Sequence, residues 1–259
     1  MAEKLHIISS GSKANSYIIQ SDEGSIIIDQ GLSFKQFKCA AVELGIDLSD
    51  AIAILVTHEH TDHVHGVVYT ACKLGIPVFS TSQTLQKICT GEKYQVDTKS
   101  MIPDRPQRIG RFTCTAFSTM HDAADPVGFF LEMPSGENFC LATDTGMVTN
   151  RMLSYFNRCE HLILEANHDV GMLYKNPRYP ADLKRRIHSK YGHLSNESSI
   201  DALSRMERHP KTVVFAHLSE ENNTPATVKT LVLDFKKSSN ADFKAFIAYQ
   251  NDPYSIKLN

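Results

Sequence analysis

The sequence lacks several features that would assign it to a specialised class of protein. Its 259 residues include no tryptophan and no C-x-x-C pair, and the formal net charge is only −2. The longest clean apolar run, at 51–56, is far shorter than the roughly 18–20 residues that a membrane span requires. The first ten residues contain no apolar core of a secretion signal, so we expect a cytoplasmic protein without a membrane segment.

The six cysteines lie at least 17 residues apart, which indicates small buried apolar residues and neither a disulfide framework nor a zinc knot. The near-neutral charge argues against a uniformly basic surface for nucleic acid but leaves a local basic patch open. With no repeat and no low-complexity linker, the sequence predicts a single domain over residues 1–259.

Short runs rich in Ile and Val predict strands, and the later ones are separated by helical patterns, which indicates a mixed α/β fold. Strands are expected at 5–8, 17–19, 26–28, 52–56, 112–118, 127–131, 138–142, 161–165, 212–216 and 243–249. Helices are expected from a capping box at Ser33 and Gln36 to Gly45, and over 63–74, 179–190, 196–207 and 225–236. Asp and His residues gather where several of these strands end, as in Asp29-Gln30-Gly31.

Twelve histidines are present, and they are densest in THEHTDHVHG at 57–66, directly after an apolar strand. In an extended segment His58 and His60 face the same way and can share one metal ion. Asp62 and His63 diverge from them and suit a second ion nearby. Imidazole and carboxylate ligands suit Zn, Mn or Fe. The alternative, an exposed loop that is His-rich by chance, is disfavoured by this density of ligand types after a buried strand.

The pattern His-x-His-x-Asp-His resembles the signature of the metallo-β-lactamase fold, a four-layer αββα sandwich with a two-metal site between its sheets. The resemblance extends to three later positions that end predicted strands, namely His121, Asp144 and His217. It implies that His58, His60 and His121 bind one divalent ion. Asp62, His63 and His217 would bind the other, and Asp144 would bridge the two.

Several branches share this pattern. Lactamases proper carry Cys where Asp144 stands, so β-lactam hydrolysis is not expected. Glyoxalase-II-type thioesterases share all seven ligands and are not excluded by them. The segments 162–167 and 192–196 resemble the ribonuclease Z group, in which a Glu-supported His assists phosphodiester cleavage. That resemblance carries roles over to His193 and Glu165 only, and the metal ligand Asp62 completes the candidate catalytic set.

A resemblance to the YycJ/WalJ/VicX-type proteins runs through almost the whole chain. It is carried by the segments GSKANS at 11–16, HEHTDHVHG at 58–66, HDA at 121–123 with PVGF at 126–129, EANHD at 165–169, GHLSN at 192–196 and HLS at 217–219 with NN at 222–223. The resemblance implies a cytosolic, metal-dependent 5′→3′ exonuclease acting on double-stranded DNA. The expected partner is therefore DNA, and no protein partner is indicated.

Phosphodiester cleavage suits such a site. Two ions about 3.5–4 Å apart share a hydroxide and stabilise charge on the attacking and leaving oxygens, and they lower the pKa of water from 15.7 to about 7. The leaving 3′-oxygen then needs a proton. Our hypothesis is that His193 supplies this proton while Glu165 orients the imidazole and raises its pKa. A plain polar residue at a helix start is the alternative for His193.

Weaker signals complete the prediction. The candidates for supporting the ligands or binding substrate are Asn15, Ser16, Asp122, His168 and Asn196, against the alternative of plain turns and surface loops. Lys184, Arg185 and Arg186 form a candidate phosphate-backbone patch on one helix, against the alternative of a solvated helix face. Two other functions stay open: a small-molecule hydrolase (thioesterase or small phosphodiesterase), and a metal-binding regulatory partner with little turnover.

Overall fold

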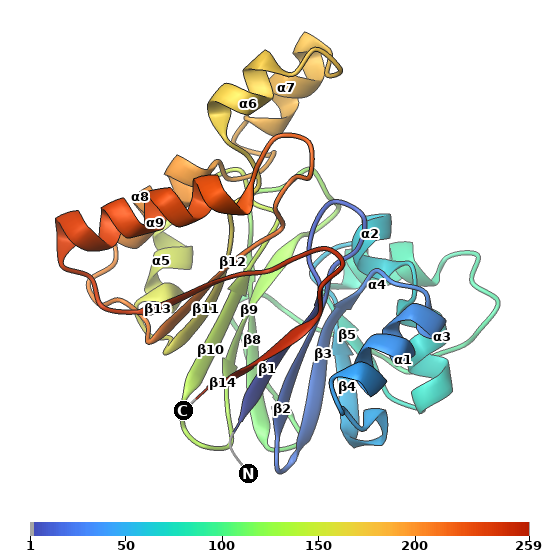
Figure 1. Cartoon of the computed structure of the whole chain (residues 1–259). Coiled ribbons are helices and arrows are strands. Elements are labelled where there is room, and N and C mark those ends of the chain that lie inside the picture. Colours follow the sequence, from blue (N-terminus) through green and yellow to red (C-terminus); the bar gives the residue numbers. More distant parts are fainter. Residues whose placement is uncertain (1–2, 259) are drawn as a thin grey trace.

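A computed structural model describes residues 3–258, and it places two sheets face to face between outer layers of helices (Figure 1). This arrangement confirms the predicted four-layer αββα sandwich. Within the described residues, no helix is both long enough and apolar enough to cross a bilayer.

The first sheet has seven strands in the order β14-β1-β2-β3-β4-β5-β6. Their bounds are β1 (Lys4–Ser9), β2 (Ser16–Ser21), β3 (Gly24–Gln30), β4 (Ala51–Leu55), β5 (Val78–Ser80), β6 (Thr98–Ser100) and β14 (Tyr254–Lys257). Neighbours pair antiparallel from β14 to β3 and parallel from β3 to β6.

The second sheet repeats this plan in the order β13-β12-β11-β10-β9-β8-β7. Its strands are β7 (Pro106–Ile109), β8 (Phe112–Ser118), β9 (Val127–Glu132), β10 (Asn138–Ala142), β11 (His161–Glu165), β12 (Thr212–Ala216) and β13 (Lys244–Ile247). Pairing is parallel from β13 to β10 and antiparallel from β10 to β7. Parallel strands are covered on both faces, so β11 and β12 are buried along their whole length and read as continuous apolar runs.

Helices cover the outer faces of both sheets. The first sheet packs on α1 (Phe34–Glu43), α3 (Val67–Leu74) and α4 (Ser82–Cys89), and the second on α5 (Asn150–Phe156), α8 (Asn196–Ser204) and α9 (Pro225–Ser239). The remaining helical segments are η1 (Leu48–Asp50), α2 (Thr61–Val64), α6 (Val170–Lys175) and α7 (Ala181–Ile187), the last two projecting from one end of the sandwich (Figure 1). A central apolar core between the sheets contains residues from both, such as Leu55 and Phe129.

One helix prediction is wrong. The expected helix over 63–74 is divided, because α2 ends at Val64 and α3 begins at Val67. At the break, the backbone N–H of Gly66 donates to the Gln30 carbonyl, and a Cβ at Gly66 would lie 2.1 Å from the Leu32 carbonyl oxygen. The chain therefore leaves the helix to pack backbone against backbone on the loop after β3.

The other boundaries show what short-range patterns can detect. The capping box predicted at Ser33 and Gln36 is present at the start of α1. The helices expected over 179–190 and 196–207 are shorter, since α7 covers Ala181–Ile187 and α8 covers Asn196–Ser204. The short elements β5, β6, β7, β14, α4, α5 and α6 were not predicted, because three to eight residues carry too little periodicity.

Candidate metal centre and active site

Strand ends of both sheets meet at one end of the sandwich and supply most of the candidate site. Asp29 is the next-to-last residue of β3, Asp144 lies two residues after β10, Glu165 ends β11 and His217 follows β12. Asp29, Asp144 and His217 have φ angles of 54°, 56° and 57°, a left-handed conformation that residues other than glycine rarely adopt. Such backbone strain persists only where the surrounding structure imposes it, and it is typical of functional sites.

His58, His60 and His121 form the first ligand group. The Nε2 atom of His58 lies 3.0 Å from Nδ1 of His60, which lies 3.3 Å from Nε2 of His121. His58 and His121 are buried, and the three nitrogen atoms converge on one point. The structure thus assembles the first predicted ligand set.

Asp62, His63 and His217 form the second group. Oδ2 of Asp62 lies 3.3 Å from Nε2 of His63 and 3.5 Å from Nε2 of His217. Asp144 stands between the groups, with Oδ2 3.2 Å from Nε2 of His63 and Oδ1 3.8 Å from Nε2 of His121. All seven predicted ligands are therefore close together, and Asp144 reaches both sets.

The other nitrogen of four of these imidazoles is held by the protein. The contacts are His58 Nδ1 to Thr57 Oγ1 at 3.0 Å, His63 Nδ1 to Asp29 Oδ2 at 2.7 Å, His121 Nδ1 to the Gly192 carbonyl at 2.9 Å and His217 Nδ1 to Glu165 Oε1 at 3.0 Å. Such partners fix ring orientation and tautomer at metal sites, because they leave Nε2 free to bind an ion. Here Nε2 is the atom that each ring turns toward the cluster.

The cluster holds potential metal-binding atoms that make no hydrogen bond within residues 3–258, although each lies near a group of opposite charge. Oδ2 of Asp144 and Nε2 of His217 are buried and make no hydrogen bond with any described residue. Burying such atoms without a partner costs roughly 1–3 kcal/mol each, and more for a charged group. A cation satisfies a carboxylate oxygen and an imidazole nitrogen at once, so the donor set fits divalent metal ions.

Protonation states in the cluster also suit metal binding. Burial opposes the charged form of Asp144, but His217 and His63 outweigh it and hold the pKa of that carboxyl well below its ordinary value. Burial, followed by the charge of His63, lowers the pKa of His58 well below the ordinary histidine value. An ionised carboxylate and a neutral imidazole are the forms that bind metal.

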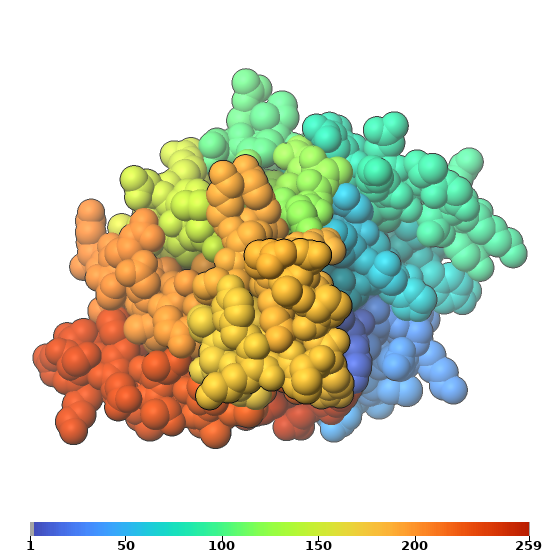
Figure 2. All heavy atoms as spheres, turned by 90° about the horizontal axis from the view of Figure 1, so that it is seen from above, coloured from blue at the N-terminus to red at the C-terminus, as the bar shows by residue number. Residues whose placement is uncertain are grey.

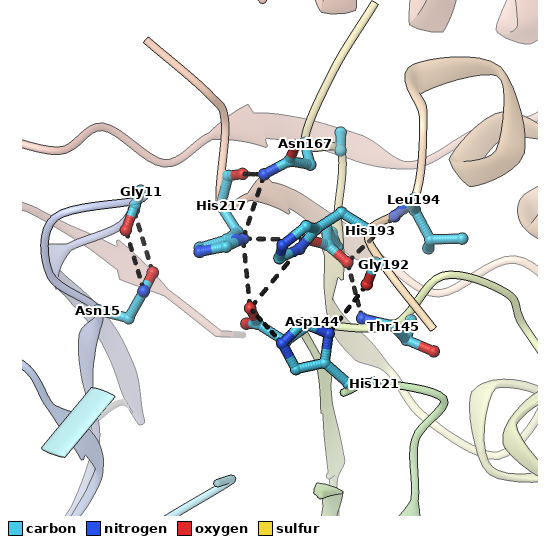
Figure 3. A network of polar contacts seen from close by, with 12 residues as sticks. Gly11, Asn15, His121, Asp144, Thr145, Asn167, Gly192, His193, Leu194 and His217 are labelled. Carbon is cyan, nitrogen blue, oxygen red and sulfur yellow. Dashed lines mark hydrogen bonds and ion pairs between the residues drawn. The ribbon is translucent and has the colours of Figure 1, made fainter. Parts of the chain in front are cut away.

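His193 and Glu165 pair beside the cluster, and Figure 3 shows the His193 ring next to Asp144 and His217. His193 Nδ1 lies 2.6 Å from Glu165 Oε1, while Oε2 of this buried carboxylate accepts hydrogen bonds from the backbone N–H groups of Thr145 and Leu194. Burial alone would lower the pKa of His193, but the charge and hydrogen bond of Glu165 raise it above the ordinary value. Burial is likewise outweighed at Glu165, where His193 lowers the carboxyl pKa to about 2.

The His193 ring opens onto a small cavity of about 190 Å³ that also adjoins the first ligand group. The cavity is lined by His60, His121, Asp122, Leu183, Arg186, Ile187, Gly192 and His193. The ring centroid of His193 is 5.0 Å from that of His121 and 5.2 Å from that of His217. A scissile group held at the cluster would therefore lie beside an imidazole that can donate a proton.

The supporting candidates have different positions. Asn15 reaches the second group, with Nδ2 3.0 Å from His63 Nε2 and 3.2 Å from Asp62 Oδ2. Asp122 Oδ1 lies 3.5 Å from His121 Nε2. Ser16 is buried in β2, and its hydroxyl has no hydrogen-bond partner among residues 3–258.

His168 and Asn196 lie behind the His193 loop and not among the ligands. Nε2 of His168 is 3.1 Å from Nδ1 of His188, and the His168 carbonyl accepts from the Asn196 backbone N–H. The Asn196 side chain exchanges hydrogen bonds with Asn223 at 2.8 and 2.9 Å. Burial, with the charge of His188, lowers the pKa of His168 to about 4.

The three basic candidates of α7 make different contacts. Lys184 donates to the Tyr174 carbonyl, and Arg185 pairs with Asp182 on the same helix. Arg186 pairs with Asp122 and is the member of the three that lines the 190 Å³ cavity.

Two contributors were not assigned from the sequence. Asp29 was noted at a strand end, yet nothing local indicated that it holds His63. Asn223 donates to the Ala166 and Asn167 carbonyls and pairs with Asn196, so it joins the loops after β11 and β12 to the start of α8. The only sequence signal was its place in the segment after His217.

Comparison with known proteins agrees with this geometry. Residues 25–218 match the family described as the Beta-lactamase superfamily domain. Exodeoxyribonuclease WalJ of Streptococcus pneumoniae is 35% identical over 226 residues, which cover 85% of this chain and 83% of that protein. The chain belongs to the WalJ/YycJ family of the β-lactamase superfamily.

One further sequence relative and one solved structure also resemble this chain. Exodeoxyribonuclease YycJ of Bacillus anthracis is 32% identical over 225 residues, covering 84% of this chain and 83% of that protein. The crystal structure of the metallo-β-lactamase fold protein YhfI from Bacillus subtilis superposes with a TM-score of 0.72 at 16% identity, covering 99% of this chain and 100% of that one. That second likeness concerns the fold alone.

Proposed function

We propose that this chain is a metal-dependent exodeoxyribonuclease that hydrolyses phosphodiester bonds from a 5′ end of double-stranded DNA. The observation that carries the proposal is the Glu165–His193 pair, at 2.6 Å, beside the seven converging ligand residues. The names of the WalJ and YycJ relatives support deoxyribonucleic acid as the substrate. We also propose that residues 1–259 form a single domain and that the protein is cytoplasmic.

The ligand assignment follows the contacts. His58, His60 and His121 would hold one divalent ion, Asp62, His63 and His217 the other, and Asp144 both. Zn, Mn and Fe all suit this donor set. When bound, such ions supply Lewis-acid stabilisation of charge on the phosphate and make a nucleophilic water available at neutral pH.

The protein's own residues carry out the remaining work. His193, protonated because Glu165 raises its pKa, would donate a proton to the leaving 3′-oxygen. Glu165 is fixed by the Thr145 and Leu194 backbone N–H groups, so it keeps the imidazole aimed at the cavity. Arg186, at the cavity wall, is placed to attract the phosphate backbone.

A substrate comparison tests the proposal. The purified protein, stripped with a chelator and reloaded with Mn²⁺ or Zn²⁺, is incubated with linear duplex DNA labelled at one 5′ or one 3′ end, with a glutathione thioester and with a small phosphodiester. We expect metal-dependent release of nucleotides from the 5′ end. Hydrolysis of the thioester alone would support the small-molecule alternative, and metal binding without hydrolysis of any substrate would support the regulatory alternative.

A further inference from the structure

A second cavity lies where α1 and α3 begin, beside the ligand loop. Its volume is about 520 Å³, which is within the range of small-ligand pockets. It is lined by Ser33, Phe34, Lys35, Lys38, His65, Gly66 and Tyr69. We call it the α1–α3 pocket. Neither the sequence motifs nor the proposed metal chemistry accounts for it.

Two aromatic rings, those of Phe34 and Tyr69, line the α1–α3 pocket. The ring centroids of Phe34 and Tyr69 lie 5.7 Å apart at an angle of 73°, and Tyr69 lies 5.3 Å from Tyr94. Tyr69 and Tyr94 are 36% and 38% exposed, so part of each ring is accessible from solvent. Three rings from separate segments thus form an accessible cluster.

Positive charge also lines the α1–α3 pocket, through Lys35 and Lys38. Lys35 and Lys38 are exposed and lie three residues apart, and the ammonium groups of Lys73 and Lys93 lie 5.3 and 6.0 Å from the Tyr69 and Tyr94 ring centroids. Among the described residues, none of these four lysines has a carboxylate within 4.0 Å. The first turns of α1 and α3 also contain no acidic residue. Arg185 and Arg186 of α7, by contrast, are both paired with aspartates.

The pocket lies close to the ligand cluster along the chain. His65 follows the ligand residue His63 by two positions, so their Cα atoms lie no more than about 7 Å apart. Ser33 follows Asp29, the partner of His63, by four positions. Seen from above, the blue to cyan segments of α1 to α3 lie on one side of α6 and α7, and the orange-red segment of α9 lies on the other (Figure 2).

We propose that the α1–α3 pocket binds an unpaired nucleotide of the DNA substrate, with the base on Phe34 and Tyr69 and the adjoining phosphates on Lys35 and Lys38. Accessible rings beside a basic groove are the means by which proteins hold single strands, since every base has a stackable face. A base inside a duplex is already stacked, so duplex DNA would use the lysines and leave the rings unused. The inference rests on the proposed function and adds that the enzyme holds a separated strand next to the cluster.

Binding without hydrolysis tests this directly. The chelator-stripped protein is titrated into fluorescein-labelled oligothymidylate, and anisotropy is followed over a range of salt concentrations. Tyr69→Ala is expected to weaken binding about tenfold, and Tyr69→Phe to restore it, because the stacking face returns. Lys35→Ala/Lys38→Ala is expected to lower the slope of log K against log salt by about 1.4, since each phosphate contact on a single strand contributes about 0.7.

The control is Lys229→Ala/Lys237→Ala, which removes two exposed lysines of α9 on the other sheet. Oligothymidylate binding unchanged in Tyr69→Ala, or reduced equally by the α9 control, would overturn the inference while leaving DNA hydrolysis untouched. A protein that hydrolyses no DNA but loses oligothymidylate binding in Tyr69→Ala would instead contradict the proposed function and keep the pocket as a single-strand site.

Discussion

Asp29 and His63 are both fully buried, and Oδ2 of the carboxylate lies 2.7 Å from Nδ1 of the imidazole. The same carboxylate accepts hydrogen bonds from the backbone N–H and the hydroxyl of Thr57. Asp29 therefore anchors the start of the ligand loop and one ligand of the second group, although it lies 34 residues before His63.

Replacing this carboxylate should weaken metal binding. In Asp29→Asn the amide places either a donor or a weaker acceptor at His63 Nδ1, which disturbs the tautomer needed at Nε2. Because partners of this kind contribute about 10–100-fold to metal affinity, we expect a loss of that size in a competition titration against a chelator. Asp47→Asn, at an exposed helix cap, is the control. Equal metal affinity in both variants would contradict the role of Asp29.

His193→Ala should lower turnover on duplex DNA by roughly 10²-fold or more, because it removes the proton donor for the leaving oxygen. Bound metal, measured by elemental analysis, should stay at the wild-type amount. His209→Asn is the matched control, since His209 packs on Phe235 and Phe243 and lies outside the described ligand groups. Unchanged turnover in His193→Ala would rule out the assigned role.

Arg186→Ala should weaken duplex binding and lower its salt dependence by about one unit of slope, the value for roughly one phosphate contact. Arg185→Ala is the matched comparison because Arg185 lies on the same helix but outside the cavity. We expect Arg185→Ala to have a smaller effect in the same anisotropy titration. Equal effects of the two variants would indicate that α7 presents a solvated basic face and that Arg186 makes no specific contact with a phosphate.

Asn223→Ala should destabilise the protein. Its side chain donates to two buried backbone carbonyls and to Asn196, so the substitution leaves buried acceptors without partners. We expect the free energy of unfolding to fall by about 1–3 kcal/mol in urea titration. Asn223→Ala combined with Asn196→Ala should cost less than the sum of the two, because they share hydrogen bonds. Strict additivity would show that the pair is not coupled.

The buried His6 should make stability depend on pH. Burial lowers its pKa, although its ring contacts Ser255 and Gln20. The unfolded chain, with a histidine pKa of about 6.5, then binds this proton more readily than the folded protein. The contribution of His6 is full above pH 6.5 and is lost as the pH falls toward the lowered pKa.

Urea titrations of the chelator-stripped protein at pH 7.5 and 5.5 measure this loss. His6→Gln should lose less stability between the two values than the wild type. The control is His65→Gln, because the His65 side chain is exposed. The same loss in His6→Gln and the wild type would contradict the prediction.

The apolar strands were predictable because burial on both faces leaves a continuous apolar run. The predicted strands over 112–118, 138–142, 161–165 and 212–216 have the bounds found in β8, β10, β11 and β12. The edge strands β6 and β14 escaped prediction, since each is short and largely exposed or mixed in burial. The break in the helix after His63 was also not predicted. It depends on the loop after β3, which packs against Gly66 and is distant in sequence.

The sequence alone predicted the seven candidate ligands: four come from the segment at 58–63, and a family resemblance implied His121, Asp144 and His217. Tertiary structure decided what supports them: Asp29 at His63, Asn223 behind the His193 loop, and the α1–α3 pocket. Phe34, Tyr69 and Tyr94 lie in three separate segments, and no local pattern brings them together. Such contacts depend on which strands and helices become neighbours, and burial of the apolar core decides that across long separations in sequence.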